Sequence, residues 1–181
     1  MQPLASLRHF LAISLILSSA FLSDPASYGG EETQATVNLS AAEAQIMGKE
    51  AKLVKMNGAD VITGWRSPND WLKWGANIPV PGIYNVILEY AYAGKTGSNV
   101  EVAVGEQGVQ TQVVGTLGEE NFASVFLAKV EIKQSGTVPV NLTVVQKHGS
   151  VIMNMRAIHL VRTEETTLQE PAQQAVHPAT R

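Results

Sequence analysis

The sequence of 181 residues contains no cysteine, so the chain can form neither disulfides nor zinc–thiolate sites and has no cysteine nucleophile. A domain without such cross-links must be stabilised by its hydrophobic core. Charged residues are scarce at 16%, the net charge is only −3, and Lys and Arg form no cluster. This charge pattern argues against nucleic acid and anionic membranes as partners.

The familiar catalytic signatures are missing as well. No Ser lies in a Gly-x-Ser-x-Gly turn, no His pair has metal-ligand spacing, and no Gly-rich phosphate loop follows a predicted strand. The adjacent carboxylates of Glu119 and Glu120 diverge from a turn, unlike the two facing carboxyl groups of a glycoside hydrolase. We therefore expect a protein that is not an enzyme.

The only long apolar run lies close to the N-terminus. Residues 11–17 follow Arg8 and His9 and precede three small residues, and the run is shorter than the roughly 20 residues that span a bilayer. This order predicts a secretory signal peptide and export to the periplasm or the medium. The predicted organisation is therefore a signal peptide at 1–20, a flexible leader at 21–34, a folded module at 35–162 and a disordered tail at 163–181.

Between the two ends, apolar and polar residues alternate with a period of two, and turn signals recur about every ten residues. Val100, Val102 and Val104 share one face of a predicted strand that forms a hairpin with residues 109–114. The same spacing places five residues of the later segment on one face: Ser124, Phe126, Ala128, Val130 and Ile132. Nine or ten short strands without a long helix predict an all-β antiparallel β-sandwich or jelly roll.

Aromatic residues make up only 6% of the chain, yet residues 65–93 hold all three Trp and three of the four Tyr. We predict that the strand with Trp71 and Trp74 pairs with the strand at 83–93 as the central hairpin of the sandwich. Trp71 and Trp74 are three apart on a strand and should face opposite ways. Trp65 falls in a predicted loop, where its indole could either be exposed and contact a ligand or fold back over an edge of the sandwich.

Five segments form a familiar order along the chain: NDWLKW (69–74), PGIY (81–84), EYA (89–91), NF (121–122) and SVIMNMRAIHL (150–160). Together they resemble the galactose-binding-like β-sandwich of carbohydrate-binding modules. The likeness is closer still to the non-catalytic domain attached to secreted bacterial sulfatases and alpha-L-fucosidases, and it covers about residues 36–162.

The resemblance implies a sugar site on loops at one edge of the sandwich. Trp65 would stack on the sugar, Trp71 would be a core aromatic, and the polar ligand contacts would be Asn69, Asp70 and His148. Where the relatives carry a second stacking aromatic, this chain has residues 118–120, Gly-Glu-Glu.

Many such modules also hold a structural calcium ion between an early Glu-x-Glu and a late acidic residue. Glu43 and Asn154 stand at the corresponding positions here, and they are the candidate metal ligands. Because one carboxylate of the pair is replaced by Gln45 and the late residue is an amide, the set has less negative charge than Ca²⁺ prefers.

Two functional hypotheses follow. The first is a secreted, non-catalytic carbohydrate-binding accessory module that recognises a glycan. The alternative is a structural or protein-interaction β-sandwich that docks to a secreted enzyme such as a sulfatase or fucosidase, which the missing second aromatic favours. A separate possibility is that the chain is a fragment or a stand-alone copy of a domain that is normally fused to a sulfatase or fucosidase, which would explain why it carries no catalytic signature.

Overall fold

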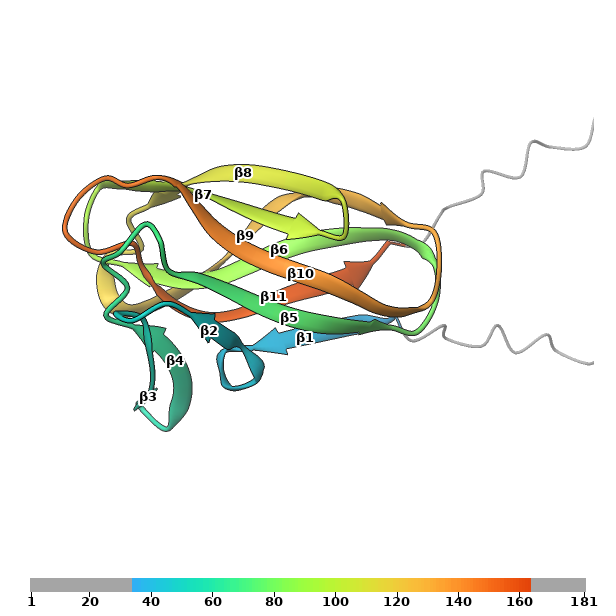
Figure 1. Ribbon diagram of the computed structural model, residues 1–181, viewed down its shortest axis with the longest axis horizontal. Coiled ribbons are helices and arrows are strands. Elements are labelled where there is room, and N and C mark those ends of the chain that lie inside the picture. Colours follow the sequence, from blue (N-terminus) through green and yellow to red (C-terminus); the bar gives the residue numbers. More distant parts are fainter. Residues whose placement is uncertain (1–33, 164–181) are drawn as a thin grey trace, which may run out of the picture. The chain divides into compact units, whose positions relative to one another are not determined.

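The computed structural model describes residues 34–163, so the predicted signal peptide, nearly all of the leader and all of the tail beyond Thr163 lie outside the described residues. Eleven strands and one short 3₁₀ turn make up the described part (Figure 1). Their bounds are β1 Thr36–Ser40, η1 Ala41–Glu43, β2 Gln45–Met47, β3 Lys52–Met56, β4 Ala59–Thr63, β5 Trp71–Ile78, β6 Gly82–Tyr92, β7 Thr96–Val104, β8 Gln107–Val114, β9 Gly118–Ile132, β10 Gly136–Gln146 and β11 Asn154–Arg162. No helix among residues 34–163 is long and apolar enough to cross a membrane.

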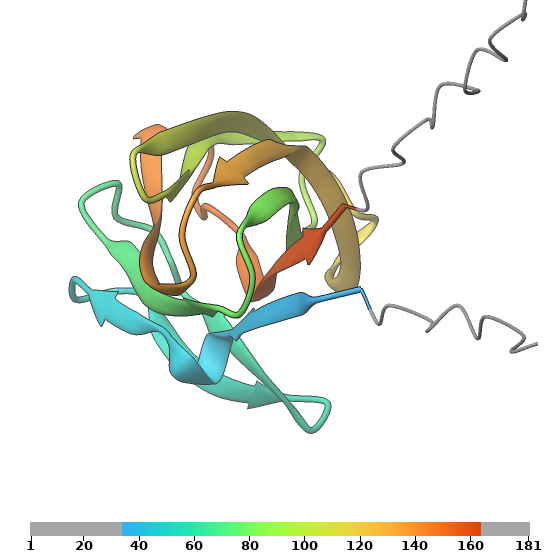
Figure 2. The same cartoon turned by 90° about the vertical axis from the view of Figure 1, so that its right-hand side faces the viewer.

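The strands form two antiparallel sheets that enclose one core (Figure 2). Sheet A has the order β3-β4-β11-β6-β9, with β1 paired to β11, and sheet B has the order β2-β5-β10-β7-β8. The predicted all-β antiparallel sandwich is confirmed.

The core consists of the alternate residues that each strand turns inward. Val100, Val102 and Val104 of β7 are buried, as their spacing predicts, and Val140 and Leu142 of the neighbouring strand β10 are buried beside them. The large aromatic members of the core are Trp65, Trp74, Tyr84, Tyr90 and Tyr92.

The predicted central hairpin is wrong, because β5 belongs to sheet B and β6 to sheet A. Pro79 and Pro81 have no N–H to donate to a ladder, so the chain crosses from one sheet to the other instead of turning back beside itself. The Tyr84 hydroxyl donates to the Val80 carbonyl and holds this crossing in place. β5 and β6 each turn their apolar residues into the core between the two sheets.

The predicted inward face of residues 124–132 holds only in its second half. Val130 and Ile132 are buried, but Phe126 is 56% exposed. The register between β6 and β9 shifts between Val86 and Ile87, which pair with Ala128 and Phe126, so Leu127 is an extra residue. Such a bulge inverts the alternation of the strand before it.

Candidate functional site

The loops β4–β5, β6–β7, β8–β9 and β10–β11 meet at one end of the sandwich, at the left of Figure 1, which we call the loop end. The resemblance predicts the sugar site here. All four predicted ligand-binding residues lie on these loops: Trp65, Asn69, Asp70 and His148.

Trp65 is fully buried, so the prediction of an exposed stacking ring is wrong. Its indole Nε1 donates to the Ser67 carbonyl at 3.1 Å, and its carbonyl accepts the N–H of Ile152 at 2.7 Å. Burying an indole removes a large apolar surface from water, and this gain draws the loop over the open end of the core. Trp65 therefore closes the sandwich and leaves no ring face for a ligand.

Asp70 is only 3% exposed, and its carboxylate binds the chain itself. Its oxygens accept the backbone N–H groups of Lys49 at 3.2 Å, Glu50 at 2.8 Å and Ala51 at 2.9 Å. Burial raises the pKa of Asp70, but these backbone hydrogen bonds outweigh it, and the pKa is lowered from its usual value. Its predicted role as a ligand contact does not hold, because both oxygens are occupied and covered.

Asn69 and His148 keep exposed side chains, and their ligand contacts remain predictions. The backbone of His148 is fixed by the buried Ser98 hydroxyl, which accepts its N–H at 3.0 Å and donates to its carbonyl at 3.1 Å. The Asn69 N–H donates to the Ser67 hydroxyl at 3.1 Å. Both loops are thus held by contacts within the chain.

A small polar pocket of about 110 Å³ lies at the loop end. Its polar lining includes Thr63, Arg66, Glu119 and Asn154, and none of the four predicted ligand-binding residues lines it. Both ends of the Asn154 carboxamide are engaged, because its Oδ1 accepts a hydrogen bond from the Thr63 hydroxyl at 2.6 Å and its Nδ2 donates to the Glu119 carbonyl at 2.8 Å. Tyr92, the only aromatic residue in this lining, is buried.

The two candidate calcium ligands are each engaged elsewhere. The Glu43 carboxylate accepts the Ser40 N–H at 3.1 Å and the Ser40 hydroxyl at 2.9 Å, which caps η1. Asn154 bridges the loops as described above. Within residues 34–163, no three side chains among His, Cys, Asp and Glu gather closely enough to hold a metal ion.

Trp71 and Trp74 do face opposite ways, but the core role expected for Trp71 is wrong. Trp74 is the buried member, and its Nε1 donates to the Ser40 carbonyl at 2.8 Å. Trp71 is half-buried on the outer face of sheet B. The signal was present in the alternation, because the residues in phase with Trp74 are all apolar: Leu72, Ala76 and Ile78.

The half-buried Trp71 lines a shallow depression of about 350 Å³ together with Pro68, Asn141 and Thr143, which we call the Trp71 surface. The Asn141 side chain faces outward from β10, where it pairs with Lys73 of β5. Its Oδ1 is buried and has no hydrogen-bond partner among the described residues. Such an acceptor calls for a donor that the chain does not supply, for example a water or a ligand hydroxyl.

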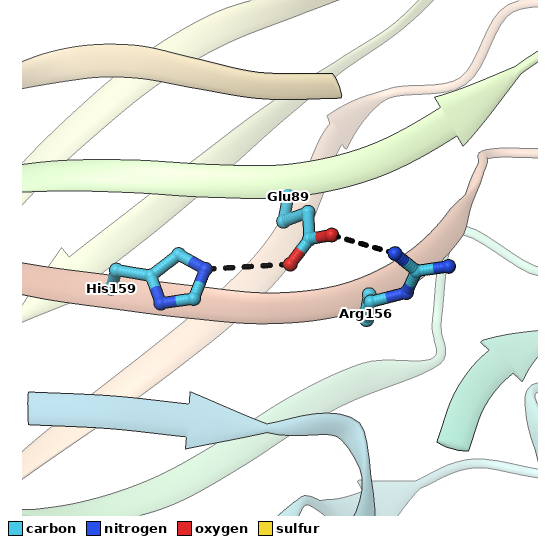
Figure 3. A network of polar contacts seen from close by, with 3 residues as sticks. All are labelled: Glu89, Arg156 and His159. Atoms are coloured by element: carbon cyan, nitrogen blue, oxygen red, sulfur yellow. Dashed lines mark hydrogen bonds and ion pairs between the residues drawn. The ribbon is translucent and has the colours of Figure 1, made fainter. Parts of the chain in front are cut away.

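The outer face of sheet A differs in character (Figure 3). Glu89 of β6 lies between two β11 side chains, 2.9 Å from Arg156 Nη1 and 3.4 Å from His159 Nε2. The Arg156 guanidinium also lies 3.7 Å from the centre of the Phe122 ring. Glu89 thus links the two β11 side chains, while the buried Arg156 Nε has no hydrogen-bond partner among the described residues.

Residues 32–165 match the family described as "Domain of unknown function (DUF5077)". The chain belongs to this family. No curated protein matches the sequence of this DUF5077 chain at a significant level.

Solved structures similar to the DUF5077 chain include a family 35 carbohydrate-binding module from Clostridium thermocellum, with a TM-score of 0.59 and 18% identity over 71% of this chain and 99% of that one. The C-terminal family 6 module of a marine laminarinase from Zobellia galactanivorans has a TM-score of 0.58 and 19% identity over 71% and 100%. An exo-beta-1,3-galactanase from Phanerochaete chrysosporium, in complex with galactose, has a TM-score of 0.57 and 18% identity over 70% of this chain and 29% of that one. At these identities the likeness establishes the fold.

Proposed function

We propose that this DUF5077 chain is an exported, non-catalytic accessory module that binds carbohydrate on its Trp71 surface. The observation that carries the proposal is the half-buried Trp71 indole beside the Asn141 Oδ1, which has no hydrogen-bond partner in the described part of the chain, on the outer face of sheet B. Export is supported by the signal-peptide pattern of residues 1–20.

The chemistry of a pyranose suits this pair of groups. One face of the ring presents C–H groups that pack on an indole, while its rim presents hydroxyls that must be hydrogen-bonded when they leave water. Trp71 and Pro68 supply the apolar contact, and Asn141 and Thr143 supply an acceptor, a donor and a hydroxyl within the same depression. A shallow site of this kind combines one apolar platform with a few placed polar groups.

The fold adds support to this assignment. Two of the similar structures are described as carbohydrate-binding modules, and a third is a galactanase in complex with galactose. The loop-end pocket is smaller and has no exposed aromatic ring, so we place the sugar on the sheet face.

The test is calorimetric titration of the exported chain with laminarin, β-1,3-galactan, xylan and alginate. We expect saturable binding to at least one of them, weakened more than about tenfold in Trp71→Ala, since the lost indole contact is worth over 1.4 kcal/mol. Phe126→Ala is the matched control, because it removes an exposed aromatic ring from sheet A and should bind normally. No binding to any of the four glycans, or equal binding by the Trp71 variant, would refute the proposal.

A second candidate, docking to a secreted enzyme such as a sulfatase or fucosidase, is favoured by one observation on sheet A. Phe126 is 56% exposed and pairs directly with Ile87, which places two apolar side chains together on the outer face. Phe126→Ala should then abolish co-purification with the enzyme, whereas Trp71→Ala should not. Equal recovery of the enzyme with both variants would exclude this face as the docking site.

A further inference from the structure

We infer that the Trp71 surface continues across sheet B as a track that binds an internal segment of a neutral polysaccharide chain. This inference rests on the proposed function and names the class of glycan. It is carried by the row of side chains that the strand register places beside Trp71.

The strand register places one residue from each of four neighbouring strands in a row that runs perpendicular to the strands. Leu142 of β10 pairs with Leu72 of β5, which brings Thr143 beside Trp71, and both residues line the depression. Thr143 pairs in turn with Glu101 of β7, and Glu101 pairs with Gln110 of β8. The row Trp71, Thr143, Glu101, Gln110 therefore runs across four adjacent strands on one face.

This row is longer than a single sugar ring. Adjacent strands lie about 4.8 Å apart, so the three steps from β5 to β8 cover about 14 Å. A monosaccharide stacked on Trp71 would leave the far end of the row uncovered. A short oligosaccharide laid across the strands would contact all of it.

On one side, the half of the track that lies over β7 and β8 is open. The next row is Lys73, Asn141, Ala103 and Gly108, so its far half carries only a methyl group and a glycine. A Cβ added to Gly108 would lie 3.0 Å from the Glu101 carboxyl carbon, which means that the Glu101 side chain lies along the sheet at this point. At this point the Glu101 Oε2 accepts a hydrogen bond from the Gln110 Nε2 at 3.0 Å.

The chemistry of the face favours a neutral ligand. The polar side chains are chiefly carboxamides and hydroxyls: Asn99, Gln110, Gln112, Asn141 and Thr143. Carboxamides offer both donors and acceptors, as sugar hydroxyls require. In the two rows, Lys73 is the only cation and Glu101 the only anion, so the face holds no excess of positive charge for the carboxylates of an acidic polysaccharide.

The test measures how affinity depends on chain length. The full chain is titrated with laminari-oligosaccharides and β-1,3-galacto-oligosaccharides from the mono- to the hexasaccharide. We expect affinity to rise at least about tenfold between the mono- and the tetrasaccharide and then to level off, because each added sugar gains contacts worth about 1 kcal/mol only while the track continues.

The variant Gln110→Ala removes the far end of the row without touching Trp71. It should weaken binding of the hexasaccharide about three- to tenfold, the loss of one hydrogen bond, and leave the shortest oligosaccharide that binds unaffected. Gln134→Ala, which changes an exposed Gln in the β9–β10 turn, is the matched control and should bind like the unchanged chain. Thermal melts of both variants should match that of the unchanged chain.

The outcomes separate the two proposals. If Trp71→Ala abolishes binding while affinity is independent of length and Gln110→Ala has no effect, the track is refuted and the proposed function stands. If alginate binds more tightly than every neutral glycan, the neutral class is refuted. If no glycan binds, or Trp71→Ala binds as well as the unchanged chain, the proposed function itself fails.

Discussion

Replacing Asp70 by Asn tests how the loop end is held together. Oδ2 of Asp70 accepts the N–H groups of Glu50 and Ala51, and Oδ1 accepts that of Lys49. An Asn in the same place keeps one acceptor oxygen and turns an NH₂ group toward a backbone N–H. It loses at least one hydrogen bond to a charged group, so Asp70→Asn should cost about 2–3 kcal/mol in the free energy of unfolding.

The matched control is Asp60→Asn. Asp60 pairs with Lys55 at 2.8 Å, but the two side chains are 30% and 67% exposed. An exposed ion pair of this kind contributes at most about 1 kcal/mol. The two variants make the same chemical change and differ in burial, so urea unfolding at pH 7 should separate them clearly.

The pH dependence supplies the sharper check. Because the backbone hydrogen bonds lower the pKa of Asp70 in the folded chain, its stabilising effect is complete above the usual Asp pKa of about 3.9 and is lost as the pH falls through the folded-state value. The stability difference between the unchanged chain and Asp70→Asn should stay constant from about pH 7 to pH 5 and shrink below about pH 4. A difference that is independent of pH, or no larger than that of Asp60→Asn, would refute the reasoning.

Three further changes test single contacts through thermal unfolding. Gly115→Ala should cost about 1–3 kcal/mol, because the new Cβ would lie 2.2 Å from the Gly94 carbonyl oxygen. Leu117→Gly should raise stability by about 0.5 kcal/mol, since Leu117 is 95% exposed and has a φ of +72°. Gln107→Ala should cost about 1–2 kcal/mol, because this carboxamide donates to the Glu131 carbonyl at 2.6 Å and accepts the Glu131 N–H at 3.1 Å, which joins the two sheets. Lowered stability in Leu117→Gly, or unchanged stability in either of the others, would contradict these expectations.

Sequence reasoning succeeded where local pattern decides structure. The valines of β7 alternate without interruption, and all three face the core. The dipeptide Asn57-Gly58 is in itself a strong hairpin signal, and it forms the turn between β3 and β4 with φ values of 49° and 81°. Such features depend on adjacent residues, so a single sequence contains them.

Sequence reasoning failed where the burial or the pairing of a residue depends on distant parts of the chain. Trp65 does lie in a loop, as predicted, but it is buried in the core with Ile152, almost ninety positions later, and the local sequence does not show this. The bulge at Leu127 reverses the face of Phe126 and has no mark in the sequence itself. The assignment of β5 and β6 to different sheets depends on which strands pair with each, namely β10 and β11.

The loop end holds itself together with the groups that would otherwise contact a ligand. The Asp70 carboxylate and the Ser98 hydroxyl form hydrogen bonds to the backbone of neighbouring loops, the Thr116 hydroxyl accepts the N–H of Tyr92 at the end of β6, and the Trp65 indole is buried. Polar groups that already have partners within the chain gain little from a sugar hydroxyl. Trp71 and Asn141 differ, because Trp71 is only half-buried and the Asn141 Oδ1 has no donor among residues 34–163. The absence of a second aromatic at residues 118–120 therefore does not count against carbohydrate binding, since under our proposal the sugar lies on sheet B and never reaches those residues of β9.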